Sequence, residues 1–318
     1  MSNEKPLLVI LGPTASGKTH LAVQIASALG GEIISADSRQ VYREMNIGTG
    51  KDLEEYRVGG TPVPYHLIDI ADPGSQYNVN DFQHDFEGIH QHIIAKGSVP
   101  ILCGGTGFYI YALLKGHAYS AIPVNTQLRQ DLEQLPVEEL NQRLERYETE
   151  YQKLADTSTR KRLIRAIEIS EYLTAFPEAG IQFTKPGIDQ HSIIFGLNPP
   201  VEIRRAKISA RLDQRLASGL IEEVEQLLKK LSPEQLIYYG LEYKYITQYL
   251  IGEMDFAAMK ARLETEIHRF AKRQMTFFRK MEKDGLRIHW LSHESTEAEK
   301  VDFISEQYLA FGSAKSRS

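Results

Sequence analysis

A glycine-rich segment near the amino end constrains the fold of this chain more than any other feature. Residues Gly12–Thr19 read GPTASGKT, follow the apolar run Leu7–Leu11 and precede an apolar-periodic stretch. The pattern G-x-x-x-x-G-K-T between a strand and a helix is typical of a phosphate-binding loop, because glycines let backbone N–H groups approach phosphate oxygens. We therefore predict a strand over Leu7–Leu11 and a helix over Lys18–Leu29.

The same loop supplies the ligands expected for a diphosphate group. Lys18 adds a mobile positive charge, and the Thr19 hydroxyl can bind Mg²⁺, the one cofactor we expect. The following helix presents the positive end of its dipole to the same oxygens. The predicted diphosphate site comprises Gly12, Thr14, Ala15, Ser16, Gly17, Lys18 and Thr19. The loop does not reveal which bond is broken.

Short apolar runs alternate with helical patterns through the first third of the chain, which indicates βαβ units and a mainly parallel sheet. Further strands are predicted at Glu32–Ser35, His66–Ile68, Val99–Cys103, Ser192–Leu197 and Arg287–Leu291. Further helices are predicted at Asn80–Lys96, Thr106–Leu114, Val201–Ser218, Leu220–Leu231, Leu241–Ile251, Phe256–Lys283 and Glu297–Ala310. In the longest helix, apolar residues spaced by three and four predict one buried face, formed by Met259, Leu263, Ile267 and Phe270.

The pattern changes between residues 119 and 187. This segment is charged and helix-favouring, and its edges carry the turn signals Ile122-Pro123 and Lys185-Pro186-Gly187. We therefore predict an α/β fold in which residues 1–118 and 188–318 form a P-loop NTPase-like catalytic core, with a parallel sheet flanked by helices. Residues 119–187 would form an all-helical insertion domain.

Composition excludes some classes of protein. The only cysteine, Cys103, lies in an apolar run, which predicts a buried, inert thiol and rules out an intramolecular disulfide. The sequence shows no signal-peptide pattern and no apolar run of membrane-spanning length, so we expect a cytoplasmic protein with no membrane partner. The net charge of −5 opposes indiscriminate nucleic-acid binding, but Thr159–Arg165 and Ile267–Lys283 are locally basic.

An aspartate follows the predicted second strand, in the segment ISADSRQVY. This position places Asp37 at the carboxyl edge of a parallel sheet, where ligands bind in open α/β folds. The chemistry alone leaves two interpretations open. Asp37 either holds a metal-bound water or caps a helix, or it is a general base that takes a proton from a nucleophile.

Seven blocks occur in a fixed order over about residues 7–291: Gly12–Thr19, Asp37–Tyr42 (DSRQVY), His66–Asp69 (HLID), Gly104–Tyr109 (GGTGFY), Lys161–Ala166 (KRLIRA), Arg211–Arg215 (RLDQR) and Ala271–Arg279 (AKRQMTFFR). Through them the sequence resembles the tRNA dimethylallyltransferase (tRNA isopentenyltransferase) family of bacterial type. That family moves the dimethylallyl group of dimethylallyl diphosphate onto N6 of the adenine 3′-adjacent to the anticodon, in tRNAs that read codons beginning with U.

The resemblance implies that the phosphate loop binds a leaving diphosphate rather than the end of ATP. Backbone N–H groups, Lys18 and Mg²⁺ would stabilise the negative charge that develops on the departing group. The resemblance also assigns Asp37 as the base, together with Thr106 and Arg215 as further catalytic residues. Thr106 would contact the target adenine, although it also fits a helix cap. Arg215 would reach the diphosphate, and Arg211 is a weaker candidate.

An enzyme acting on this adenine must draw the base out of the anticodon-loop stack while basic groups follow the RNA backbone. In the family, both basic runs correspond to tRNA-contacting segments. The resemblance implies tRNA contacts at Asp37, Ser38, Arg39, Gln40, Thr106, Arg129, Lys161, Arg162, Leu163, Ile164, Arg165, Lys244, Lys272, Arg273 and Arg279. The expected partners are the tRNA anticodon stem-loop and dimethylallyl diphosphate, bound by a monomer. His66 is expected to be a structural residue at a strand end.

Some positions depart from the family pattern. Asp156–Thr159 stands where many members carry His-Pro-Asn-Asp, and Glu242-Tyr243-Lys244 replaces the usual Gly-Tyr-Lys. These changes bear on tRNA docking rather than on the diphosphate. Three other functions remain to be weighed: an enzyme that prenylates free adenine nucleotides such as AMP, a P-loop kinase that transfers the γ-phosphate of ATP, and a non-catalytic RNA-binding protein.

Overall fold

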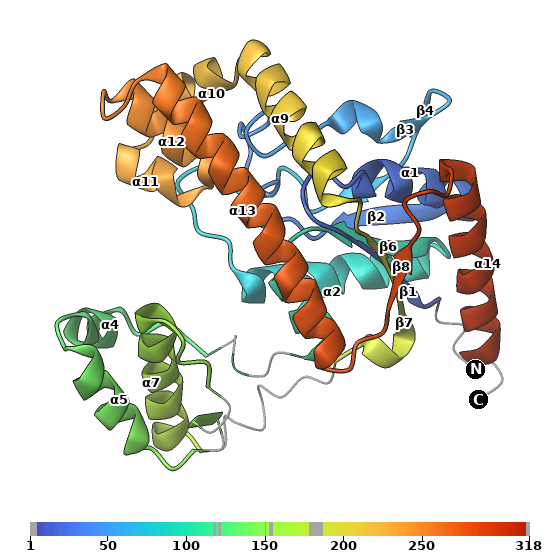
Figure 1. Cartoon of the computed structure of the whole chain (residues 1–318). Helices are drawn as coiled ribbons and strands as arrows, with labels where there is room; N and C mark the ends of the chain where they lie inside the picture. Colours follow the sequence, from blue (N-terminus) through green and yellow to red (C-terminus); the bar gives the residue numbers. More distant parts are fainter. Residues whose placement is uncertain are drawn as a thin grey trace. The chain divides into compact units, whose positions relative to one another are not determined.

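The computed structural model describes residues 5–116, 119, 122–149, 151–152, 155–177 and 187–315. The chain divides into two compact units, one formed by Met1–Leu114 with Ile188–Ser318 and the other by Lys115–Gly187. We call them the core unit and the insertion. The core unit contains a sheet with helices on both faces, whereas the described part of the insertion is helical (Figure 1). Within the described ranges, none of the helices is both long and apolar enough to cross a membrane.

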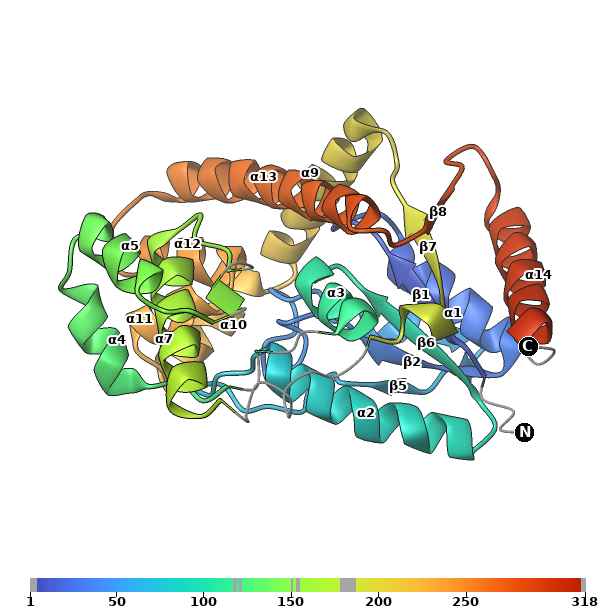
Figure 2. The ribbon, with the colours of Figure 1, turned by 90° about the horizontal axis from the view of Figure 1, so that it is seen from below.

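The central sheet of the core unit has six strands in the order β5-β2-β6-β1-β7-β8, and every adjacent pair is parallel (Figure 2). The strands are β1 (Leu7–Leu11), β2 (Gly31–Ser35), β5 (Tyr65–His66), β6 (Val99–Gly104), β7 (Ser192–Leu197) and β8 (Ile288–Leu291). Strands buried on both faces are expected to be continuously apolar, as LLVIL in β1 is. The predicted α/β fold with a parallel sheet is confirmed.

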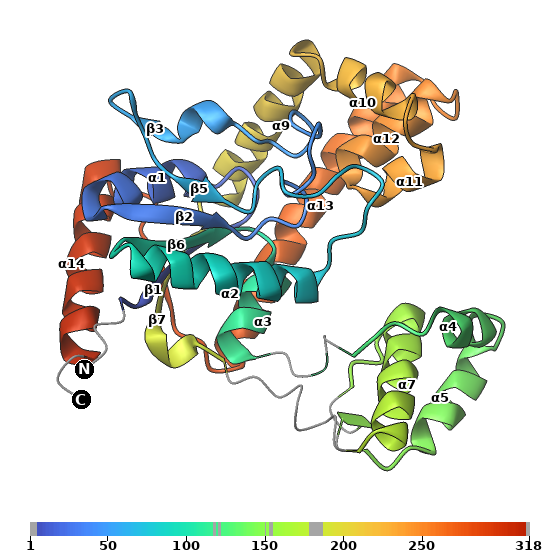
Figure 3. The same cartoon turned by 180° about the vertical axis from the view of Figure 1, so that it is seen from behind.

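Helices cover both faces of this sheet. Leu8 and Ile10 of β1 pack with α1 (Lys18–Leu29) and α14 (Glu297–Lys315) on one face. Val9 points to the other face, where it packs with α2 (Val79–Ala95) and α3 (Gly107–Lys115) (Figure 3). Because side chains alternate along a strand, each strand supplies both cores. The carboxyl ends of these parallel strands meet at one edge, and the loops that follow β1, β2 and β6 are brought together there.

A second layer of helices packs beside this edge of the sheet. It contains α9 (Val201–Ala217), α10 (Leu220–Leu228), α11 (Pro233–Tyr238), α12 (Leu241–Leu250) and α13 (Phe256–Lys283). These helices share a core with the segment that follows β2, including Tyr42, Tyr243 and Leu263. The 28-residue helix α13 runs from this layer to the sheet, where Met275, Phe278 and Met281 join the core of the sheet (Figure 1).

The structure corrects several predicted boundaries. Strand β5 ends at His66 rather than Ile68, because Leu67 and Asp69 have left-handed φ angles of 62° and 56° that interrupt a strand. The helix predicted over Leu220–Leu231 ends at Leu228, and the short helix α11 follows it. The two-stranded hairpin of β3 (Arg57–Val58) and β4 (Thr61–Pro62) was not predicted from the sequence.

The prediction that Phe270 belongs to the buried face of α13 is wrong. Met259, Leu263 and Ile267 are buried as expected, but the Phe270 side chain is 40% exposed. With 3.6 residues per turn, the buried stripe continues through Ala271 instead, and Phe270 falls beside it.

The insertion is built on α4 (Thr126–Glu133), α5 (Val137–Glu145) and α7 (Arg160–Ala175). Its core is formed by leucine, isoleucine and alanine side chains from all three helices, among them Leu132, Leu140 and Ile167. The predicted boundary residues Lys185 and Pro186 lie outside the described residues.

Candidate active site

The phosphate loop leaves the carboxyl end of β1 and forms a concave stretch of backbone. Ala15 and Gly17 have left-handed φ angles of 59° and 85°. Successive N–H groups in such a conformation turn toward one side and create an anion-binding concavity. A Cβ atom at Gly12 would lie 2.7 Å from Ser16 Oγ and 2.9 Å from the Leu197 carbonyl oxygen, so glycine is required there.

Lys18 is positioned for an anion that the chain does not provide. Among the described residues, no carboxylate oxygen lies within 4.0 Å of its ammonium, although the side chain is partly buried. Burial lowers the pKa of Lys18, and attraction from the Asp37 carboxylate opposes this effect. An unpaired, partly buried charge is unfavourable, and a bound anion would offset this cost.

Cys103 lies against the same loop. Its buried thiol donates to the Lys18 carbonyl oxygen at 3.7 Å, and burial raises its pKa to about 12. The predicted buried thiol is confirmed, and the raised pKa makes it a poor nucleophile.

The loop opens into a cavity of about 590 Å³, a volume typical of small-molecule sites. The cavity brings together fourteen residues predicted for the site: Thr14, Ala15, Ser16, Gly17, Lys18, Thr19, Asp37, Ser38, Arg39, Gln40, Thr106, Arg215, Lys244 and Arg273. Three other predicted residues of the core unit, Gly12, Lys272 and Arg279, do not line it.

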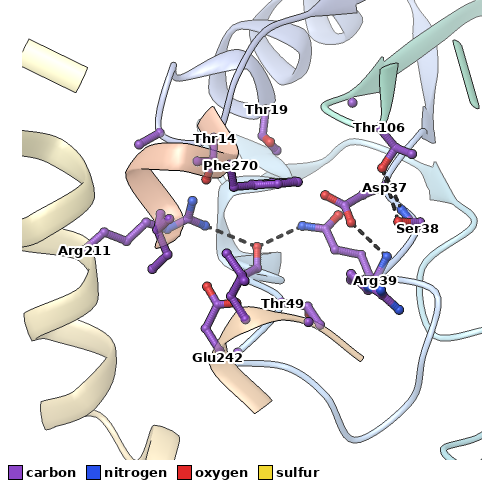
Figure 4. Close-up of a pocket in the computed structure, with 18 of the residues that line it drawn as sticks. Thr14, Thr19, Asp37, Ser38, Arg39, Thr49, Thr106, Arg211, Glu242 and Phe270 are labelled. Atoms are coloured by element: carbon purple, nitrogen blue, oxygen red, sulfur yellow. Dashed lines mark hydrogen bonds between the residues drawn. The ribbon is translucent and has the colours of Figure 1, made fainter. Parts of the chain in front are cut away.

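Asp37 enters the cavity from the end of β2 beside the end of β6 (Figure 4). Its Oδ1 accepts a hydrogen bond from Arg39 N at 2.9 Å, which orients the carboxylate. The Thr106 hydroxyl accepts from Ser38 N at 3.0 Å, and Thr106 N donates to the Ala36 carbonyl at 3.1 Å. These bonds hold the Thr106 turn against both residues that flank Asp37.

Two arginines of α9 reach the cavity from the same helix face. Arg211 Nη2 is 2.9 Å from Asp52 Oδ2, and Arg215 Nη1 is 3.5 Å from Glu242 Oε1. A Cβ at Gly50, where φ is 69°, would lie 1.8 Å from Arg215 Nη2 and 2.3 Å from Arg211 Nη2. Burial, and then the charge of Arg211, lower the pKa of Arg215. Like charges on one helix face are unfavourable, and an anionic ligand would relieve their repulsion.

The segment that carries Gly50 is anchored by one carboxylate of α10. Glu223 accepts hydrogen bonds from the backbone N–H groups of Asn46, Ile47 and Gly48 at 2.9, 2.7 and 3.0 Å. It also accepts from the Tyr243 hydroxyl at 2.8 Å. Sequence reasoning missed this anchor because three of its four partners are backbone groups more than 170 residues away.

Part of the cavity lining is apolar, and we call it the apolar wall. It is contributed by α11, α12 and α13 and comprises Ile237, Tyr238, Leu241, Ile267 and Phe270. The ring of Phe270 projects toward Asp37 and the phosphate loop (Figure 4). Tyr238 and Phe270 are 42% and 40% exposed, so these rings are available to an apolar part of a ligand.

Comparison with known proteins assigns the family. Residues 40–281 match the model of the IPP transferase family, and residues 5–63 match that of isopentenyl transferase. The chain belongs to the IPP transferase family. It is 49% identical to tRNA dimethylallyltransferase 2 of Bacteroides fragilis over 306 residues, or 96% of this chain and 98% of the relative. A similar enzyme of Parabacteroides distasonis is 49% identical over 300 residues, or 93% and 95% of the two chains.

Solved structures agree with this assignment to the IPP transferase family. The full-length tRNA isopentenylpyrophosphate transferase of Bacillus halodurans aligns with a TM-score of 0.70 and 30% identity, covering 98% of this chain and 99% of its own. A eukaryotic dimethylallyltransferase acting on tRNA aligns with a TM-score of 0.78 over 96% of this chain and 80% of its own. At 24% identity, that second likeness supports the fold alone.

In this member of the family, two predicted RNA-binding arginines of the insertion are engaged internally. Arg129 Nε and Nη2 lie 3.1 and 2.9 Å from the two carboxylate oxygens of Glu168, and Arg165 binds the same carboxylate. Glu168 is 2% exposed. Burial alone would raise its pKa, but hydrogen bonds from Arg129 and Arg165 hold that pKa below its ordinary value.

The remaining predicted residues of the basic helix α7 divide into two groups. The side chains of Leu163 and Ile164 are 1% and 5% exposed, so they fill the core of the insertion and present no side-chain surface to RNA. Lys161 and Arg162 are exposed, and Arg162 Nη1 is 2.9 Å from Asp156 Oδ2. Lys161 forms no ion pair with any described residue.

The residues present fit a divalent metal bound mainly by the substrate. Within the described part of the chain, no three His, Cys, Asp or Glu side chains are grouped so as to bind a metal ion. The Thr19 hydroxyl lines the cavity and is a hard oxygen donor of the kind Mg²⁺ accepts. Mg²⁺ is commonly bound by few protein groups, together with phosphate oxygens and water.

His66 has the structural role expected of it. Its Nε2 lies 2.8 Å from Oε2 of the buried Glu32, which Lys96 also contacts at 3.3 Å. This pair links β5 to β2 outside the cavity.

Proposed function

We propose that the chain transfers the dimethylallyl group of dimethylallyl diphosphate to N6 of the adenine 3′-adjacent to the anticodon, in tRNAs reading codons that begin with U. One observation carries the proposal. A single cavity contains an anion cradle, an oriented carboxylate at Asp37 and an apolar aromatic wall. Near full-length similarity to proteins named tRNA dimethylallyltransferase supports the same reaction.

The diphosphate would lie in the phosphate loop, with Lys18 and Arg215 on its oxygens. As the bond from the allylic carbon to the diphosphate oxygen breaks, negative charge develops on the leaving group. Preorganised N–H groups and cations stabilise this charge more in the transition state than in the ground state. Mg²⁺ bound at Thr19 would supply further charge neutralisation to the diphosphate.

The adenine N6 would attack the allylic carbon from the side of Asp37. The new carbon–nitrogen bond forms as the carbon–oxygen bond breaks, and one N6 proton passes to the Asp37 carboxylate. The amine is a weak nucleophile because its lone pair is delocalised, so a positioned base accelerates the step. Thr106, whose hydroxyl accepts a hydrogen bond from Ser38 N, would contact the adenine.

The apolar wall would receive the five-carbon chain. Phe270 and Tyr238 exclude water from the allylic carbon, which limits loss of the substrate by hydrolysis. The π face of each ring that Arg39 or Arg273 does not cover would also favour the partial positive charge that develops on this carbon.

The tRNA contacts of the core unit would come from Ser38, Arg39, Gln40, Lys244 and Arg273 at the cavity, with Lys272 and Arg279 on the exposed side of α13. In the insertion, Lys161 and Arg162 are the exposed cations that would contact phosphates. We further propose that the enzyme acts as a monomer, since every residue assigned to catalysis belongs to the core unit of one chain. We also propose that it acts in the cytoplasm.

A direct assay separates this function from its alternatives. The protein is incubated with Mg²⁺, unmodified tRNA or AMP, and either dimethylallyl diphosphate or γ-labelled ATP. We expect a five-carbon addition to adenine in tRNA. Modification of AMP without tRNA would favour the free-nucleotide enzyme, and transfer of label from ATP would favour a kinase. Binding of tRNA without any transfer would favour a non-catalytic protein.

Asp37→Ala tests the assigned base. We expect turnover to fall by about 10²–10⁴-fold, the usual contribution of general base catalysis, with tRNA affinity largely retained. Steady-state kinetics and a filter-binding assay measure the two quantities. Asp72→Ala is the matched control, because Asp72 is exposed and paired with Arg43. Normal turnover in Asp37→Ala would remove this residue as the base.

A further inference from the structure

Gln274 occupies an unusual position on the long helix α13. The helix is rich in charged residues, yet this uncharged polar side chain lies on its buried stripe, next to Met275, and is 8% exposed. A buried amide is costly unless its donors and acceptors are paired. Its partners therefore indicate its role.

The amide of Gln274 bridges two loops of the active site. Its Oε1 accepts from the backbone N–H of Thr14 in the phosphate loop at 2.8 Å. Its Nε2 donates to the carbonyl oxygen of Gly105 at 2.8 Å. Because Thr14 N can only donate and Gly105 O can only accept, these partners fix which way the amide points.

One of these loops would bind the leaving diphosphate, and the other lies beside the assigned base, Asp37. Thr14 belongs to the cradle of the leaving diphosphate. Gly105 precedes Thr106, whose hydroxyl accepts from Ser38 N beside Asp37. The single side chain of Gln274 therefore connects the diphosphate site to the loop that lies beside the catalytic base, Asp37.

We propose that Gln274 is a positioning residue that sets the distance between the diphosphate cradle and the Asp37–Thr106 pair. This inference rests on the proposed function. In an in-line displacement, the nucleophile must lie opposite the leaving group across the allylic carbon, and the base must reach the proton of the nucleophile. An error of about 1 Å costs roughly 100-fold in rate. Gln274 lines the same cavity, but both hydrogen bonds of its amide go to backbone atoms of the two loops, so it acts through the backbone of both loops.

The spacing at Gly105 offers a second way to test the bridge. A Cβ atom there would lie 2.6 Å from Gln274 Nε2, and its other close neighbours, Gly12 O and Lys18 Nζ, are 3.4 and 3.5 Å away. Gly105→Ala therefore displaces the amide while Gln274 itself is unchanged. Gly88→Ala is its control, because a Cβ at Gly88 meets nothing within 4 Å.

The main variant is Gln274→Met, which keeps the length of the side chain but removes both hydrogen bonds. Gln226→Met, at an exposed position of α10, is its control. We expect kcat to fall by about 10–100-fold in Gln274→Met and in Gly105→Ala. The dissociation constant of tRNA should change by less than about twofold. Wild-type kcat in both variants would overturn the proposal.

A double-mutant cycle distinguishes positioning from general structural support. If Gln274 acts through the Thr106 turn, Gln274→Met combined with Thr106→Ala should lose less activity than the product of the single losses. Multiplicative losses, accompanied by a matching fall in thermal stability, would contradict the proposal and leave Gln274 as a packing residue.

Hydrogen exchange tests the bridge without any turnover. In Gln274→Met, the Thr14 amide should exchange at least about fivefold faster, the factor that corresponds to one lost hydrogen bond. Unchanged exchange would show that no such bond forms. Failure of the wild-type enzyme to prenylate tRNA would refute the proposed function instead, since that result does not depend on exchange at Thr14.

Discussion

Lys18 of the core unit and the arginines Arg129 and Arg165 of the insertion are all partly buried cations, but their surroundings differ. In the cavity, Lys18 has no carboxylate within 4.0 Å among the described residues, and Arg215 lies 3.5 Å from Glu242. In the insertion, Arg129 and Arg165 converge on one buried carboxylate. We propose that Lys18 is left for an anion that arrives with the substrate, whereas the insertion arginines stabilise their own unit. A basic run in a sequence therefore does not by itself identify a ligand-binding surface.

Among the variants that test this difference between the two units, removal of the Lys18 charge should give the largest effect. We expect Lys18→Met to lower kcat by about 10²–10³-fold, the usual loss for one group that stabilises a developing anion. Its melting temperature should be unchanged or higher, because the folded state already disfavours the charged form of Lys18. Kinetics and thermal unfolding measure the two quantities, with the exposed Lys283→Met as control. A large loss of stability in Lys18→Met would show that Lys18, like the insertion arginines, stabilises its own unit.

The opposite result is expected for the insertion. Glu168→Gln leaves two arginines without their carboxylate, which should destabilise the insertion by about 3–5 kcal/mol. Urea unfolding followed by hydrogen exchange should place the loss in α4 and α7 and leave the sheet protected. Glu171→Gln, on the same helix, is the control, because its pair with Arg143 is half-exposed and worth about 0–1 kcal/mol. Equal losses in both variants would contradict this contrast.

The same carboxylate predicts a pH dependence. The folded-state pKa of Glu168 lies below its ordinary value of 4.5. Its contribution to stability is therefore fully present above about pH 4.5 and is lost as the pH falls through the folded-state pKa. Stability of the insertion, followed by hydrogen exchange, should decline in this acidic range, and the decline should be weaker in Glu168→Gln. A pH profile that this variant leaves unaltered would contradict the assignment.

Two glycine variants test whether Arg211 and Arg215 bind the diphosphate. Gly50→Ala and Gly59→Ala both place a side chain at a left-handed φ, a strain of about 1–2 kcal/mol each. A Cβ at Gly59 meets nothing within 4 Å, whereas one at Gly50 meets Arg211 and Arg215. We expect the KM for dimethylallyl diphosphate to rise about tenfold in Gly50→Ala alone, an effect of roughly 1.4 kcal/mol. Equal KM values in the two variants would mean that these arginines do not bind the diphosphate.

The smallest effect is expected at the exposed cations of α7. Lys161→Ala combined with Arg162→Ala should weaken tRNA binding several-fold and reduce the salt dependence of log K by about 1–2. Filter binding at a series of salt concentrations measures this slope. Lys230→Ala is the control, because Lys230 is an exposed cation of the core unit paired with Glu44. An unaltered slope would show that Lys161 and Arg162 do not contact the RNA and that the RNA-binding surface lies elsewhere.

The elements whose patterns are local could be predicted from the sequence. The strand β1, the helix α1 and the 28-residue helix α13 match their predicted bounds, because apolar periodicity and the loop motif determine them. The hairpin of β3 and β4 could not be predicted, because its two-residue strands carry no periodic signal. Phe270 was misplaced because three-and-four spacing is satisfied by residues on either edge of a buried stripe.

The candidate site divides in the same manner. The phosphate loop, Asp37 and Arg215 lie in motifs, so sequence reasoning found them. Gly50 and Glu223 act through contacts between distant segments, which a sequence does not reveal. Gln274 did carry a signal, since a polar residue on the apolar stripe of a helix calls for a buried partner. Glu168, which neutralises two of the predicted RNA ligands, has the same signal in α7.

The carboxylate of Glu223 has a consequence for any attempt to transplant this active site. The turn it anchors holds Gly50 under the two arginines, yet that turn has no regular secondary structure to keep its shape. A graft of the phosphate loop and α9 onto another parallel sheet would lack this support unless α10 were carried with them. A transplanted anion site would therefore have to include α10, although no residue of this helix lines the cavity.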